Sequence, residues 1–97
     1  MLENLKQLIE NQFDIQTVQA ERIVFTDGNR VRFKNVTDLV MDHIGDYLSD
    51  KEQLEFLKLK DSEKISSTVK IFRDVHRSQE EERLLASSTF DSRALRF

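Results

Sequence analysis

The chain has 97 residues, 38% of them apolar and 34% charged, with a net charge of −3 and no cysteine. This length suits a single domain with a small core, and the missing cysteines exclude disulfides, thiolate metal sites and thiol nucleophiles. No apolar run approaches the roughly 18 residues that a membrane span needs, and the N-terminus lacks the basic segment of a signal peptide. We therefore expect a cytoplasmic protein that does not bind membranes.

Charge alternates in blocks along the chain. Residues 22–34 hold four bases against one acid, whereas residues 35–63 hold eight acids against three lysines. Such alternation is typical of acidic and basic elements that pack side by side within one fold. The alternative is a basic face that binds a polyanion or an acidic partner.

The first predicted element is an amphipathic helix from about Leu2 to Phe13, since its apolar residues recur at three- and four-residue steps. The stretch 14–19 that follows is ambiguous. Ile15 and Val18 favour an extended form, so a short extra strand remains an open alternative.

Residues 22–34 predict a β-hairpin, because two β-rich runs, 23–26 and 30–33, flank the turn sequence Asp-Gly-Asn at 27–29. A two-residue loop would oppose Phe25 to Arg30 and so mix core with charge. A three-residue loop over 27–29 opposes Phe25 to Val31 and gives one coherent apolar face, so we predict this loop.

The predicted register also opposes Ile23 to Phe33. It leaves the basic residues of the hairpin on the face that points away from the core. The outward residues are Arg22, Val24, Thr26, Arg30, Arg32 and Lys34. A two-stranded ribbon is marginal alone, so its apolar face must pack on helices or on another strand.

Three helices are predicted after the hairpin, over about 36–49, from the cap at 49 to about 60, and from 61 onwards. Their start signals are Asn35 or Thr37, the capping box of Ser49 and Glu52, and the pair Asp61-Ser62. The apolar stripe of the last helix fades beyond Val75, and residues 86–97 have no sustained period.

These elements predict an α+β fold that is mostly helical, with one β-hairpin (about 22–34) packed on about four helices in the order α-β-β-α-α-α. We expect residues 1–86 to form one compact domain and residues 87–97 to be a flexible or partner-docking C-terminal tail. The predicted core consists of Leu5, Ile9, Ile23, Phe25, Val31, Phe33, Val40, Ile44, Val69 and Phe72.

The sequence carries little that favours catalysis. His43 has Asp46 nearby, but one histidine with one carboxylate falls short of the three or four ligands of a zinc site. No serine stands in a nucleophile-elbow frame. We therefore expect no enzyme activity, no cofactor and no metal.

Nucleic-acid binding is the alternative function, through the basic ribbon face and the basic residues of the fourth helix. Those helical residues are Lys64, Lys70, Arg73 and Arg77. Against it, the chain is acidic with a pI near 5.4, whereas nucleic-acid-binding modules usually exceed a pI of about 9. The helix over 36–49 also carries three aspartates and no Lys or Arg.

The sequence favours a small non-enzymatic protein–protein interaction module, such as an adaptor, an inhibitor or an assembly factor, including phage-encoded ones. We expect a homodimer, because the apolar stripes are long for so small a core. The expected partner-binding residues are Arg22, Arg30, Arg32, Lys34, Phe90, Arg93, Leu95, Arg96 and Phe97. The tail is expected to dock on a partner or a sister subunit, with Arg93 and Arg96 contacting acidic groups.

Overall fold

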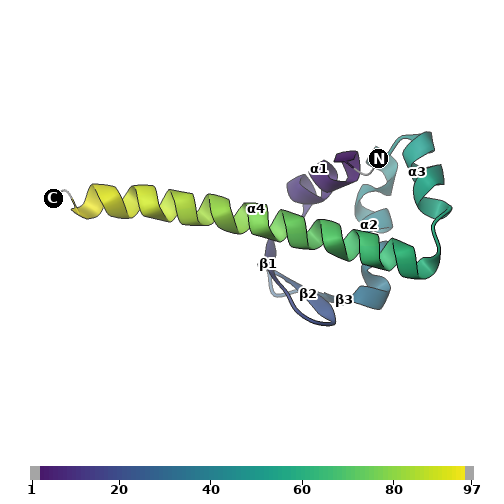
Figure 1. The fold of residues 1–97 in the computed structure, drawn as a ribbon, viewed down its shortest axis with the longest axis horizontal. Helices are drawn as coiled ribbons and strands as arrows, with labels where there is room; N and C mark the ends of the chain where they lie inside the picture. Colours follow the sequence, from purple (N-terminus) through teal and green to yellow (C-terminus); the bar gives the residue numbers. More distant parts are fainter. Residues whose placement is uncertain (1–2, 96–97) are drawn as a thin grey trace.

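The computed structural model describes the backbone of residues 3–95 and the side chains of residues 4–85. The fold is α+β and mostly helical, in the predicted order, with a third strand added to the hairpin (Figure 1). The elements are α1 (Glu3–Gln12), β1 (Ile15–Val18), β2 (Arg22–Phe25), β3 (Arg30–Arg32), the 3-10 helix η1 (Phe33–Asn35), α2 (Val36–Ile44), the 3-10 helix η2 (Gly45–Tyr47), α3 (Asp50–Leu57) and α4 (Asp61–Leu95).

The ambiguous stretch after the first helix is a strand. β1 pairs antiparallel with β2, and the sheet order is β1-β2-β3. The register shifts between Ile15 and Thr17, so one residue is inserted as a β-bulge. Because of this insertion Ile15 pairs with Phe25 and Val18 pairs with Ile23, and both β1 side chains pack with the core.

The predicted hairpin loop is wrong by one residue. Ile23 pairs with Val31 instead of Phe33, and the Phe25 amide donates to the Asn29 carbonyl at 2.9 Å, so the loop is 26–28. The Asn29 amide donates to the carboxylate of Asp27 at 2.9 Å, which fixes the turn locally. The partner residue shifts by two positions, so the inward and outward faces of residues 22–32 stay as predicted, while Phe33 and Lys34 lie on η1 instead of the strand.

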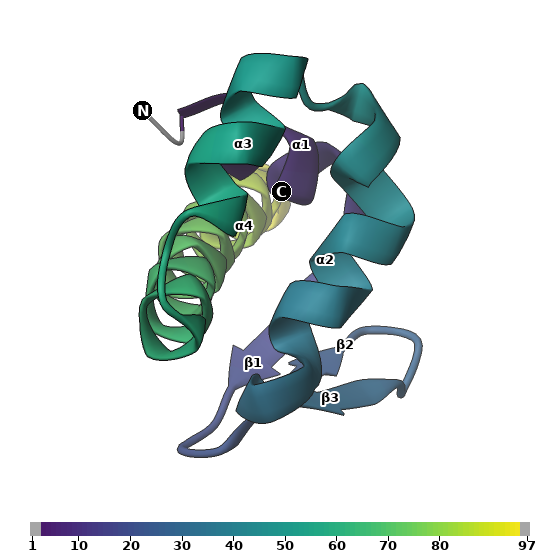
Figure 2. The same ribbon diagram turned by 90° about the vertical axis from the view of Figure 1, so that its right-hand side faces the viewer.

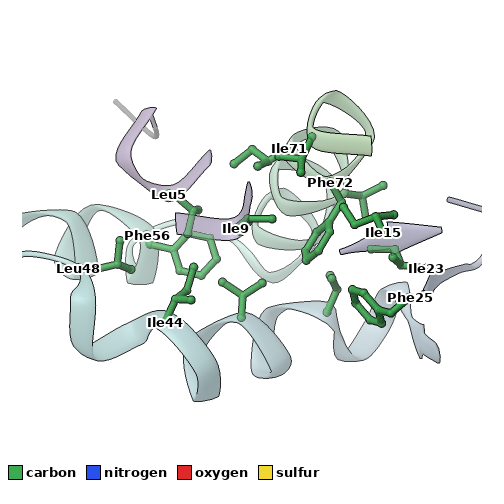
Figure 3. Close-up of a cluster of buried hydrophobic side chains, with 14 residues drawn as sticks. Leu5, Ile9, Ile15, Ile23, Phe25, Ile44, Leu48, Phe56, Ile71 and Phe72 are labelled. Carbon is green, nitrogen blue, oxygen red and sulfur yellow. The ribbon is translucent and has the colours of Figure 1, made fainter. Parts of the chain in front are cut away.

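The helices lie on one side of the sheet, with α2 and α4 above it and α1 in contact with both (Figure 2). Eight of the ten predicted core residues are buried; Val31 and Phe33 are only partly buried, because Phe33 leaves the strand and begins η1. The core also contains six residues outside that predicted set, which are Ile15, Val36, Leu48, Phe56, Ile71 and Val75; ten of the buried side chains are labelled in Figure 3. Phe72 packs its ring 5.5 Å from that of Phe13 and 6.2 Å from that of Phe25.

The start signals of the helices are confirmed in part. Ser49 and Glu52 form the predicted capping box, and α3 begins there. The side-chain amide of Asn4 donates a hydrogen bond to the Glu52 carboxylate, and Ser49 donates a second one. These bonds, that of Asn4 more than that of Ser49, lower the pKa of Glu52 below its ordinary value. Asn35 is the N-cap of α2, but its side chain makes no capping bond, and η1 supplies carbonyls instead. The predicted helix over 36–49 is shorter than expected, because the backbone departs from helix at Ile44 and continues as η2.

α4 is held to the body by polar side chains as well as by the core. His76, Gln79 and Arg83 follow one another at three- and four-residue steps, and each bonds the backbone of residues 13–16. Gln79 donates to the Phe13 carbonyl at 2.8 Å and accepts from the Ile15 amide at 3.0 Å. These bonds fix α4 against the connection between α1 and β1.

α4 continues through the stretch that was expected to be a tail and ends at Leu95. Its C-terminal end projects from the body (Figure 1). Whether residues 87–97 dock on a partner stays a prediction. Within the described chain, no helix is both long and apolar enough to cross a membrane.

Candidate protein-binding surface

Three of the four predicted hairpin cations lie on the outer face of the sheet, opposite the core. β2 and β3 alternate inward and outward residues, so Arg22 and Arg32 stand directly opposite each other. Arg30 and Arg32 are exposed, and Arg22 is half-buried. Lys34, the fourth cation, is exposed on η1. The predicted basic face is therefore present, while its role in binding stays a prediction.

None of these four cations forms an ion pair with a carboxylate among the described side chains. The ion pairs there join Lys64 to Asp61, His76 to Glu80 and Arg83 to Asp14. Like charges directly opposite each other on a sheet are destabilising, so the pair of Arg22 and Arg32 carries a cost that no ion pair with a described carboxylate reduces. An external anionic group on this face would relieve it.

An apolar groove of about 520 Å³ lies between η1 and the N-terminal part of α4. Its apolar walls are Phe33, Ile65 and Val69, and its charged walls are Lys70 and Arg73, both exposed. No acidic residue of the described chain lines it. Phe33 lies between two of the hairpin cations in sequence, so the groove adjoins the basic end of the hairpin.

The basic residues predicted on the fourth helix fall into two groups. Lys70, Arg73 and Arg77 are exposed, and their three- and four-residue spacing places them on one face of α4. Lys64 lies apart from them, with its side chain only 17% exposed and its Nζ atom 3.9 Å from the Asp61 carboxylate. Only Lys70 and Arg73 of this set line the groove.

A second hollow of about 510 Å³ lies where α1, the hairpin and α2 meet. Phe13, Phe25 and Leu39 are among its walls, and the ring of His43 lies 5.4 Å from that of Phe13. The Nδ1 atom of His43 is 2.9 Å from the Leu39 carbonyl oxygen, so this histidine is held by its own helix. Charges of both signs line the hollow, and they define no ligand class.

The second histidine, His76, and a row of aspartates lie away from the groove. The Nε2 atom of His76 lies 3.0 Å from the Gln16 carbonyl oxygen and joins α4 to β1. The aspartates at four-residue steps, Asp38, Asp42, Asp46 and Asp50, are all exposed. Among the described residues, no group of three or more His, Asp or Glu is arranged to hold a metal ion.

The predicted tail residues lie outside the described side chains. Phe90, Arg93 and Leu95 belong to the backbone of α4, and Arg96 and Phe97 lie outside the described residues altogether. Neither hollow was predicted from the sequence, since each is lined by elements that meet only in the folded chain. The one local signal for the groove was the apolar Phe33 amid hairpin cations.

Comparison of the chain with protein families, with curated proteins and with solved structures finds no match.

Proposed function

We propose that this chain is a non-enzymatic protein-interaction module, and that the groove between η1 and α4 binds an acidic segment of a partner protein through an apolar anchor residue. The observation that carries the proposal is the chemistry of the groove. Its walls combine the apolar Phe33, Ile65 and Val69 with the cations Lys70 and Arg73. An adaptor, an inhibitor and an assembly factor would all use such a site.

The two kinds of wall contribute differently. Burying an apolar anchor such as Leu or Phe is worth about 1.5–3 kcal/mol, because the side chain leaves water. Each exposed ion pair with Lys70 or Arg73 adds only about 0.2–1 kcal/mol. The anchor therefore supplies most of the affinity, and the cations select acidic over basic partners.

Nucleic acid is the alternative partner, favoured by Arg22 and Arg32, which face each other on the sheet and form no ion pair with a described carboxylate. Three features weigh against it. The chain is acidic overall, with a net charge of −3. Phe25 points into the core, so it offers no stacking platform on the basic face. An apolar groove also has no use in binding phosphates. These three features favour a protein segment over nucleic acid as the partner.

Fluorescence anisotropy of labelled probes with the full chain tests this proposal. The first probe is a peptide with a single Phe flanked by Asp and Glu, the second replaces that Phe with Ser, and the third is duplex DNA. The Phe peptide should bind best, and Arg73→Glu should weaken it about fivefold at 0.15 M salt, which corresponds to about 1 kcal/mol. Arg77→Glu is the matched control on the same face of α4 but outside the groove, and it should change binding less than twofold.

Equal binding of the Phe and Ser peptides would contradict the role of the groove, as would equal effects of the two charge reversals. Tighter binding of DNA, with an affinity that falls steeply as salt rises, would favour the nucleic-acid alternative. The homo-oligomeric state and the cytoplasmic location are separate predictions, which this experiment does not test.

A further inference from the structure

α4 is longer than the body on which it packs. At 1.5 Å per residue its 35 residues extend about 52 Å. Arg83 still bonds Asp14 and the Ile15 carbonyl, and beyond it the helix projects away from the sheet and the other helices (Figure 1). Residues 84–95 are called the arm here. Helices in proteins gain most of their stability from packing, so a surface that contacts the arm would stabilise it.

The arm cannot reach α3 of its own chain. α3 lies near the N-terminal end of α4, and the arm lies at the opposite end (Figure 1). The sequence of the arm carries apolar residues for such a contact, Leu84, Leu85, Phe90 and Leu95. An α3 surface that takes part in such a contact therefore belongs to another molecule.

A matching surface lies on η2 and α3. Leu54 and Leu57 stand one helical turn apart on α3 and are 57% and 56% exposed, and Tyr47 on η2 is 63% exposed. Asp46 precedes Tyr47 on η2, Asp50 lies one turn before Leu54 on α3, and both aspartates are exposed. These five residues are called the α3 face.

Charge favours the arm as the occupant of the α3 face. Residues 36–57 hold six acids against one lysine, whereas residues 84–97 hold two arginines against one aspartate. By contrast, the groove is lined by cations and would repel Arg93 within the arm and Arg96 after it. The arm and the α3 face are thus complementary in both apolar and charged residues.

We infer that the arm of one copy docks on the α3 face of a second copy, in an antiparallel dimer where each arm covers the α3 face of the other chain. The chain topology allows both contacts at once. α3 is joined to the start of α4 by residues 58–60, so two antiparallel α4 helices place each arm beside the partner's α3. Such an assembly is closed and two-fold symmetric. The α3 face and the groove share no residue.

Light scattering of the full chain at micromolar concentration tests the dimer. The face variant is Leu54→Glu with Leu57→Glu, and the arm variant is Phe90→Glu with Leu95→Glu. The control is Lys6→Glu, which changes an exposed residue of α1 and makes the net charge more negative by the same amount. Wild type and control should have twice the chain mass, and each double variant should have the mass of one chain.

Mixing the two double variants identifies which surfaces meet. The face variant still offers an arm and the arm variant still offers an α3 face, so the mixture should form heterodimers with one contact, at a higher concentration than wild type needs. A monomeric wild type, a face variant that dimerises like wild type, or a mixture that stays monomeric would each overturn the inference. None of these three outcomes decides whether the acidic Phe peptide binds the groove, which the anisotropy experiment measures separately.

Disulfide trapping gives a second measurement that needs no disruptive substitution. The chain has no cysteine, so Leu57→Cys in one copy and Ser92→Cys in another give a clean background. Under mild oxidation the mixture of these two single variants should cross-link far more than either alone. Cross-linking no greater than in the separate samples would overturn the inference.

Discussion

Replacing Gln79 with Leu tests how α4 is fixed to the body. The Gln79 side chain donates to the Phe13 carbonyl at 2.8 Å and accepts from the Ile15 amide at 3.0 Å, and it also lies 3.4 Å from the Glu10 carbonyl. One side chain thus pairs polar backbone groups on both sides of the connection between α1 and β1. Leucine has a similar size but neither donates nor accepts a hydrogen bond, so Gln79→Leu removes these bonds with little change in volume.

The magnitude follows from the bonds that are lost. Each of the two short bonds contributes about 0.5–1.5 kcal/mol net, and the part-buried amide and carbonyl left unpaired add to the cost. The greater apolar burial of leucine offsets a part of this. We expect the free energy of unfolding to fall by about 2 kcal/mol, which for a domain of this size lowers Tm by roughly 8–16 °C.

Urea denaturation followed by circular dichroism at the helix band measures this change. The matched control is Gln12→Leu, the same chemical change at an exposed position on α1 where the side chain makes no hydrogen bond with the described residues. The control should change the free energy of unfolding by less than about 0.5 kcal/mol. A loss at Gln79 no larger than at Gln12 would refute the role assigned to these bonds.

Three further predictions concern the cap, the core and the turn. Ser49→Ala should lower the free energy of unfolding by about 0.5–2 kcal/mol in chemical denaturation, because it removes the N-cap of α3. Since the folded pKa of Glu52 is lowered, the stability that its carboxylate contributes is complete above the ordinary glutamate pKa of about 4.3 and is lost as pH falls through the lowered value. Glu52→Gln should remove this acid dependence. Phe72→Ala, at a fully buried ring, should cost about 3–5 kcal/mol in the same assay, and a loss under 1 kcal/mol would contradict its place in the core. Gly28→Ala should lower the free energy of unfolding by about 1–2 kcal/mol in thermal unfolding. The backbone at Gly28 has φ +92°, which strains a residue with a side chain even though an added methyl group would contact no atom within 4 Å. An unchanged Tm would show that the turn relaxes.

Local signals predicted the order of the elements well. The capping box of Ser49 and Glu52 and the apolar period of α1 depend on neighbours within one or two turns, so they could be identified from the sequence. The faces of the hairpin were also predicted, because alternation survives a shift of two residues. The loop itself was not, since the Asp27 carboxylate bonds the Asn29 amide and favours a loop that begins at Thr26.

Long-range contacts explain what the sequence could not predict. β1 is stabilised as a strand by pairing with β2 and by the bond from the Ile15 amide to Gln79, which is 64 residues away. The groove forms only where Phe33 on η1 meets Ile65 and Val69 on α4. The hairpin cations could be assigned to one face, but the apolar surface beside them could not.

Chemical-shift mapping of the ¹⁵N-labelled full chain with the acidic Phe peptide locates the binding site without a substitution. The largest amide shifts should fall on the residues that line the groove, Phe33, Ser62, Ile65, Ser66, Val69, Lys70 and Arg73. The Ser peptide at the same concentration should give much smaller shifts there. Shifts that centre on the hollow around Phe13 or on the outer face of the sheet, or no shifts at millimolar peptide, would contradict binding at the groove.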